Sequence, residues 1–179
     1  MRELFDDGMS AECNLRTLDL MELPKLEKIG VMMVNLQELK VRRCPNLENL
    51  EEVLGEAENL GTLHISHTAR LKTIPKVSEK LKNLHIKSCD EMKEVFSPGM
   101  AAERYLQTLD LMELPKLEKI GVMMVSLRVL KVRRCPILKN ICPLSDLPKE
   151  LETLQIQSCN EMKEQSESEA NELPKTETA

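Results

Sequence analysis

One phrase with leucines at fixed places recurs seven times along this chain, and it constrains the fold more than any other feature. Each copy opens with a leucine, and successive copies begin 21 to 25 residues apart. If the opening leucine is position 1, positions 4 and 6 are aliphatic in every copy. Positions 9, 12 and 15 hold Leu, Ile, Val, Met, Cys or Thr, except for Gln165 in the last copy. The seven opening residues are Leu15, Leu36, Leu60, Leu81, Leu106, Leu127 and Leu151.

This pattern predicts a leucine-rich repeat solenoid, because a period of 20 to 29 residues with this spacing of leucines is typical of that architecture. Positions 4 and 6 alternate with polar neighbours, which indicates a short strand with one buried face. Stacking such strands in parallel buries a continuous aliphatic column. We therefore expect a curved, right-handed stack of about seven strands, α/β by convention, with the strands on the concave side. The returning segments contain prolines, which favours turns over regular helices on the convex side.

The chain also repeats itself at longer range: 27 of 31 residues match between 15–45 and 106–136, a shift of four repeats. The same shift places Met1 at position 12, so the chain opens inside a repeat, and we interpret it as a segment of a longer array. We predict a repeat domain at 1–164, including a partial repeat before Leu15, and an acidic disordered tail at 165–179. Both terminal layers are expected to be weak, and the first aliphatic layer is expected to lack cover.

Composition excludes several classes of function. No run approaches the roughly 18 apolar residues of a membrane span, and the acidic N-terminus does not resemble a signal peptide. We expect a cytoplasmic protein whose six cysteines are free thiols. No phosphate-binding glycine loop, H-E-x-x-H or G-x-S-x-G motif occurs, so we expect no enzyme and no cofactor. The net charge of −5 and the lack of outward aromatic residues argue against nucleic-acid binding.

The outward positions 5, 7 and 8 of each repeat form what we call the strand face. This face holds seven Lys or Arg residues, four Asp or Glu residues and all three histidines. It is therefore more basic than the chain as a whole, and we predict that it binds a protein partner. The candidate binding residues are Lys40, Arg42, Arg43, His64, His67, His85, Lys87, Lys131, Arg133 and Arg134.

Two interpretations of this charge remain open. Part of it is expected to be neutralised between neighbouring repeats, which would make the face a solvated surface with weak ion pairs. The expected pairs are Asp19 with Lys40, Glu22 with Arg43, Asp110 with Lys131, and Glu113 with Arg134. The other interpretation is a docking surface for an acidic patch, with Arg42, Lys87 and Arg133 as free cations. Clustered Cys pairs are missing, and His64 and His85 have no third ligand beside them in repeats 3 and 4, so we expect no metal site.

The repeats resemble the leucine-rich repeat region of plant intracellular immune receptors of the coiled-coil, nucleotide-binding class. The phrases that carry the resemblance are "LKVRRCPNLENL", "LHIKSCDEMKEV", "LQIQSCNEMKE" and "LMELPKLEKIG", which occurs twice. The resemblance implies a module that recognises a protein and restrains the receptor's switch. The partner would be a pathogen effector, a host protein or the receptor's own nucleotide-binding domain. Two alternatives remain: a substrate adaptor of an F-box ubiquitin ligase, and a truncated repeat fragment without a function of its own.

Overall fold

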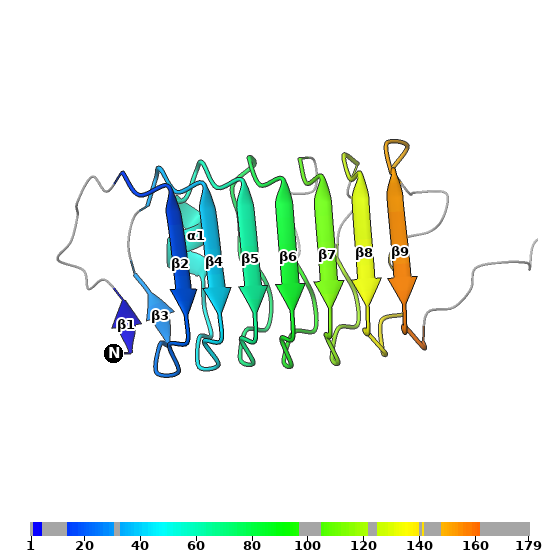
Figure 1. Ribbon diagram of the computed structural model, residues 1–179, viewed down its shortest axis with the longest axis horizontal. Coiled ribbons are helices and arrows are strands. Elements are labelled where there is room, and N and C mark those ends of the chain that lie inside the picture. Colours follow the sequence, from blue (N-terminus) through cyan, green and yellow to red (C-terminus); the bar gives the residue numbers. More distant parts are fainter. Residues whose placement is uncertain are drawn as a thin grey trace, which may run out of the picture.

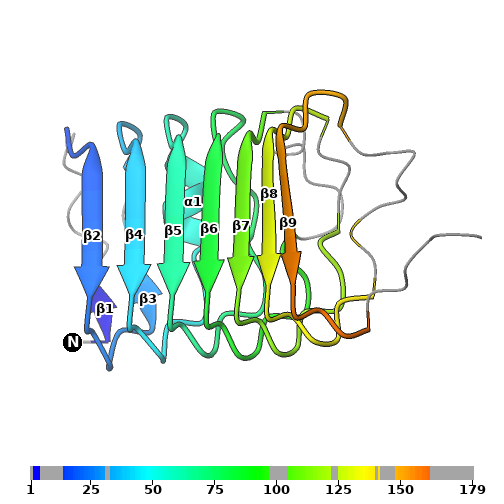
Figure 2. The ribbon, with the colours of Figure 1, turned by 45° about the vertical axis from the view of Figure 1, so that its right-hand side comes forward.

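A seven-stranded parallel sheet is the main element of the computed structural model (Figure 1). The structure describes residues 2–4, 14–30, 33–96, 105–121, 125–139, 141 and 148–161. The strands follow one another in chain order, and each pairs with its neighbours in parallel. Figure 2 shows that the sheet bends along the stack, with the returning segments on its convex side. The strands are β2 (Thr17–Met21), β4 (Glu38–Arg42), β5 (Thr62–Ser66), β6 (Asn83–Lys87), β7 (Thr108–Met112), β8 (Val129–Arg133) and β9 (Thr153–Gln157).

Every strand covers positions 3 to 7 of its repeat, as the alternation predicts. In β4 to β8 the residues at positions 4 and 6 are buried, whereas their neighbours are partly or fully exposed. The register aligns equal positions, so that Leu39 lies opposite Leu63 and Leu63 opposite Leu84. Side chains from all seven repeats thus meet in one aliphatic core. The predicted solenoid is confirmed.

Each strand ends in a left-handed residue at position 8, which the sequence analysis did not foresee. Seven non-glycine residues have φ between 52° and 58°, and all seven occupy this position. The left-handed turn directs the next residue, position 9, back toward the core. For β2 to β8, the position-8 amide donates to the position-7 carbonyl of the next repeat, which extends the ladder. The seven residues are Glu22, Arg43, His67, Ser88, Glu113, Arg134 and Ser158.

The returning segments consist mainly of turns, as their prolines predict. Within the described residues one short helix occurs, α1 (Glu51–Glu56), in the second repeat. The side-chain oxygen of Asn49 accepts a hydrogen bond from the amide of Glu51 at its start, and Val53 and Leu54 bury its inner face. This repeat is 24 residues long, whereas the repeats before and after it have 21. The three added residues provide the chain length for the helix.

The N-terminal layer is better covered than we expected. Residues 3–4 form β1 (Glu3–Leu4), which pairs in parallel with β3 (Lys28–Ile29) on the returning side. Leu4 lies opposite Ile29, so these two residues add a short strand on the returning side of the first repeat. Leu18 and Leu20 are only 8% and 6% exposed, so the expectation of an uncovered first layer is wrong.

The C-terminal layer is the exposed one. In β9, Leu154 and Ile156 are 45% and 39% exposed, although they occupy the same positions as buried residues in the other repeats. The weakness that we expected at this end agrees with this exposure. The predicted disordered tail and Gln165 lie outside the described residues.

Candidate functional site

The strand face carries its charge in stripes that follow the strands. Strand β2 and its turn are acidic, β4 and its turn are mainly basic, and the pattern recurs at β7 and β8. Strands β5 and β6 lie between these two blocks and carry the three histidines and one lysine at positions 5, 7 and 8. All ten candidate residues lie on this face, at the outward positions that the repeat predicted for them.

Two of the four predicted ion pairs form as expected, and both join position-8 residues. Arg43 Nη1 lies 2.5 Å from Glu22 Oε1, and Arg134 Nη1 lies 2.7 Å from Glu113 Oε1. In the other two cases the register is correct, because Asp19 lies opposite Lys40 and Asp110 opposite Lys131. The carboxylates nevertheless pair elsewhere.

Both aspartates pair diagonally with the arginine two positions further along the next strand. Arg42 donates from Nε and Nη2 to Asp19, whereas Arg133 donates from Nη2 to both carboxylate oxygens of Asp110, at 2.9 and 3.0 Å. The prediction that these two arginines are free cations is therefore wrong. The guanidinium group is long and planar, so it reaches a carboxylate that the lysine directly opposite does not engage.

The lysines of the face are paired differently from the prediction. Lys87, the third expected free cation, lies 3.9 Å from Glu113, and Lys40 lies 2.9 Å from Glu38 on its own strand. Among the described residues, Lys131 has no ion pair with any carboxylate. Glu113 also accepts a hydrogen bond of 2.7 Å from the Ser88 hydroxyl, which together with Arg134 lowers the pKa of this carboxyl. Charge on the face is thus mostly neutralised in place.

His64 and His85 form a stacked pair at the centre of the face. Their ring centroids are 4.3 Å apart and the ring planes differ by 4°. Burial lowers the pKa of both imidazoles below the usual value, and for His64 the neighbouring His85 lowers it further. Asp110, whose Oδ2 lies 3.9 Å from His85 Nδ1, acts in the opposite direction on the pKa of His85. His67 occupies the turn after β5 and does not join this stack.

The position-9 cysteines lie beneath the turns. Cys44, Cys89 and Cys135 are buried free thiols, and Cys159 in the last layer is partly exposed. Burial raises the pKa of the Cys135 thiol to about 11, which makes it a poor nucleophile. The Cys89 thiol lies 3.1 Å from the hydroxyl of Thr68, the residue at the same position in the preceding repeat. These side chains fill the core, as predicted; Cys13 and Cys142 lie outside the described residues.

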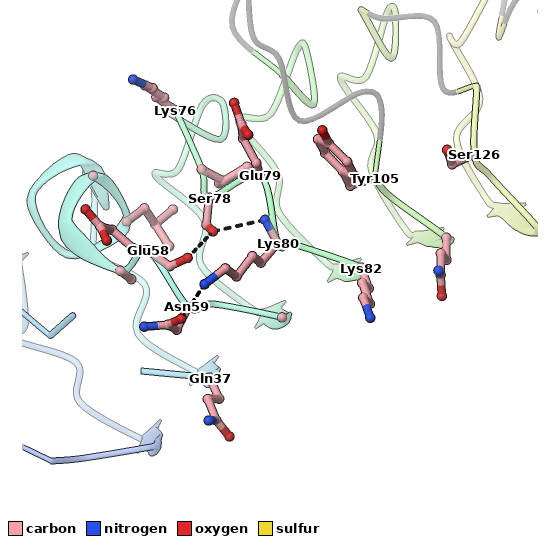
Figure 3. Close-up of a pocket in the computed structure, with 16 residues that line it drawn as sticks. Gln37, Glu58, Asn59, Lys76, Ser78, Glu79, Lys80, Lys82, Tyr105 and Ser126 are labelled. Atoms are coloured by element: carbon pink, nitrogen blue, oxygen red, sulfur yellow. Dashed lines mark hydrogen bonds between the residues drawn. The ribbon is translucent and has the colours of Figure 1, made fainter. Parts of the chain in front are cut away.

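A hollow of about 1070 Å³ lies at the edge of the sheet where β5, β6 and β7 begin (Figure 3). The Lys80 ammonium donates to the side-chain oxygen of Asn59, and the Ser78 hydroxyl donates to the Glu58 carbonyl. Tyr105, the only tyrosine of the chain, borders this hollow and is 48% exposed. Sequence reasoning missed the hollow, because its residues come from helix α1 and from the segments before several strands, which carry no shared motif.

Metal binding and membrane insertion find no support in the described parts of the chain. No group of three or more His, Cys, Asp or Glu side chains there is arranged to hold a metal ion. No helix among these residues has the length and apolar character that a membrane span requires.

Comparison with known proteins adds one match. The family model described as "Plant disease resistance protein RPS2-like, leucine-rich repeats" matches residues 31–160. This range contains five complete repeats and strand β9 of the last one. No curated protein and no solved structure is significantly similar to the chain.

Proposed function

This chain belongs to the leucine-rich repeat family of RPS2-like plant disease resistance proteins, and from that membership we propose how it acts. Repeats of this family are non-catalytic recognition modules, and leucine-rich repeats imply protein binding. The proposal is that the chain recognises a pathogen effector or a modified host protein. In the absence of that signal it holds the receptor's nucleotide-binding domain inactive. Both events would take place in the cytoplasm.

The observation that carries this proposal is the segregation of charge on the strand face. Four of the seven parallel strands, β2, β4, β7 and β8, present outward side chains in acidic and basic stripes on the concave surface. Charged groups arranged in this way favour a partner with complementary charge and disfavour others. The ion pairs across the stripes hold these side chains in defined positions, which lowers the entropy lost on binding.

Intramolecular restraint and recognition of a second protein can share this surface. A partner that competes for the same residues would release the nucleotide-binding domain, because two ligands cannot occupy one face at once. The family match favours this interpretation over the F-box adaptor, since it names resistance proteins. A nucleotide-binding loop encoded upstream of Met1 would agree with it, whereas an F-box there would contradict it.

Matched charge reversals test the proposal. The first variant carries Arg43→Glu and Arg134→Glu on the strand face; the control carries Arg70→Glu and Lys116→Glu, whose cations form similar ion pairs on the returning segments. Both variants and the unmodified chain are fused to a proximity-labelling enzyme in plant cells. We expect the strand-face variant to lose labelled partners that the control retains. Equal labelling by the two variants would contradict recognition through the strand face.

A further inference from the structure

We propose that the centre of the strand face, on β5 and β6, binds an acidic segment of a partner protein and takes up protons as it does so. This inference rests on the proposed function, because it assigns the chemistry of the partner to the same surface. It does not require the partner to be an effector, a host protein or another domain of the receptor.

Acidic groups are missing from the centre of the face. The outward positions of β5 and its turn hold Thr62, His64, Ser66 and His67, and those of β6 hold Asn83, His85, Lys87 and Ser88. None of the eight is a carboxylate. The carboxylates on either side are already engaged: the position-5 and position-8 acids of β2 and β7 pair with arginines of β4 and β8.

An approaching carboxylate would therefore meet no acidic side chain on these two strands, where the Ser88 hydroxyl already donates to Glu113 and the Asn83 amide to Thr62. Hydroxyl, amide and imidazole groups line the two strands, and among the described residues Lys87 has one ion pair, the 3.9 Å contact with Glu113. An incoming acid can compete for this ammonium, because the existing contact is long. A basic segment would instead meet Lys87 at the centre and Lys40 and Lys131 on the strands beyond it.

The histidine pair links this binding to protons. Two imidazolium ions 4.3 Å apart would repel each other, so the stacked geometry favours a pair that carries at most one charge. Charged side chains on three neighbouring strands face the histidine pair. On β4 they are Lys40, with Glu38 and Arg42 further off; on β7 they are Asp110, and on β8 Lys131. Two cations, Lys40 and Arg42, and one acid, Glu38, lie on the β4 side, and the single facing aspartate on β7 is shared with Arg133.

An acidic ligand reverses the preference of the histidine pair for the neutral form. Carboxylates placed over the two rings would stabilise the imidazolium forms and raise the pKa of both histidines toward or above the usual value. The free protein holds them neutral near pH 7, since burial lowers the pKa of each. Binding therefore takes up protons, and affinity must increase as the pH falls.

A peptide of eight glutamates provides the probe. Its side chains stay ionised at pH 6.0, so a change in affinity between pH 7.5 and 6.0 comes from the chain and not from the peptide. Binding is measured by NMR at constant ionic strength, on the full chain and on His64→Gln/His85→Gln. Each proton taken up can strengthen binding by up to about tenfold per pH unit. We expect the dissociation constant of the unmodified chain to fall about fivefold or more, with shifts of β5 and β6 amides, and that of the double variant to change little.

The control variant is Lys76→Gln/Lys82→Gln, which removes two cations from the hollow at the strand starts and leaves the face intact. It should retain the pH dependence. Binding that is independent of pH, an equal gain in the histidine variant, or shifts confined to other surfaces would each overturn the inference. Those results would leave the proposed function standing, since the labelling experiment tests that separately. If the double variant does not give a native circular dichroism spectrum, His85→Gln alone replaces it.

Discussion

Residues 15–30 and 106–121 differ at a single position, Arg16 against Gln107, yet they occupy very different places in the stack. The first stretch forms β2 at the edge of the main sheet, where β4 is its one partner among the described residues; the second forms β7, which pairs with both β6 and β8. Leu18 and Leu20 retain 8% and 6% exposure, whereas Leu109 and Leu111 have none. Since local sequence is held nearly constant, the differences between the two stretches measure what neighbouring repeats contribute.

The exposed fraction of the outward side chains differs between the two stretches even more than that of the core leucines. Asp19 and its partner Arg42 have side chains that are 39% and 44% exposed; the equivalent Asp110 and Arg133 are 20% and 29% exposed. Asp110 also faces His85 on the preceding strand, whereas β2 is the first strand of the main sheet in the part of the chain that the structure describes. Neighbours on both sides thus convert an exposed ion pair into a partly desolvated one.

The largest expected effect comes from a charge placed in the core at the two equivalent positions. Leu109→Asp buries an unpaired carboxylate at a fully enclosed site and should cost more than ~4 kcal/mol of unfolding free energy. Leu18→Asp should cost about half as much, because the edge layer can admit water. Urea melts followed by circular dichroism measure both, with Asp110→Asn as the neighbouring outward control. Equal losses from the two leucine variants would mean that position in the stack does not matter.

Amide exchange should separate the two strands without any mutation. Within the described residues, alternate amides of β2 have no strand on their outer side, while those of β7 are bonded in a continuous ladder. We expect the amides of β7 to exchange at least about tenfold more slowly than those of β2. Peptide-resolved hydrogen exchange by mass spectrometry gives the rates. Equal protection would indicate that β1 and the residues around it stabilise the first layer as fully as a complete repeat does.

The sequence predicted those features that all repeats share. Leucine positions fixed strand limits, register and buried columns, because only one alternation puts every aliphatic side chain inside. The spacing of the repeats also placed His64 beside His85. It did not reveal the diagonal choice of Asp110, since that depends on the reach of Arg133 against that of Lys131. The left-handed turn at position 8 was missed because Glu, Arg, His and Ser give no glycine or asparagine signal.

A double-mutant cycle sharpens the comparison at the paired aspartates. Removing Asp110 and Arg133 singly and together should give a coupling free energy of roughly 1 kcal/mol, in the upper part of the range for surface pairs. The same cycle on Asp19 and Arg42 should give about 0.3 kcal/mol, since water screens the more exposed pair. Thermal melts at two salt concentrations provide the values. A larger coupling for the edge pair would show that exposure does not control the strength of these bridges.

A smaller difference in stability is expected between variants of Glu22 and Glu113, the two glutamates with a left-handed backbone conformation. Glycine adopts a positive φ without steric cost, so Glu22→Gly and Glu113→Gly each relieve up to ~1 kcal/mol of backbone strain. Glu113→Gly also removes the acceptor of Ser88 and the partner of Arg134, whereas Glu22→Gly removes the Arg43 pair alone. We therefore expect Glu22→Gly to be neutral or slightly stabilising and Glu113→Gly to be destabilising. Melting temperatures that rank the two in the opposite order would argue against this account.

The smallest effect concerns the order in which the stacked histidines take up protons. Asp110 faces His85 directly, while Lys40 lies opposite His64, so acidification should protonate His85 first. Because the folded-state pKa of both imidazoles lies below the unfolded value, the unfolded chain binds more protons near pH 6, and stability declines as the pH falls through that range. Titration of the imidazole Cε1 protons by NMR gives the two midpoints. Asp110→Asn should lower the pKa of His85 and bring the two midpoints closer together, whereas Asp19→Asn on the equivalent edge strand, which has no imidazole beside it, should leave both unchanged. A shift of either midpoint caused by Asp19→Asn would mean that the electrostatic coupling extends across the face from β2. The edge strand and the enclosed strand would then differ in packing alone.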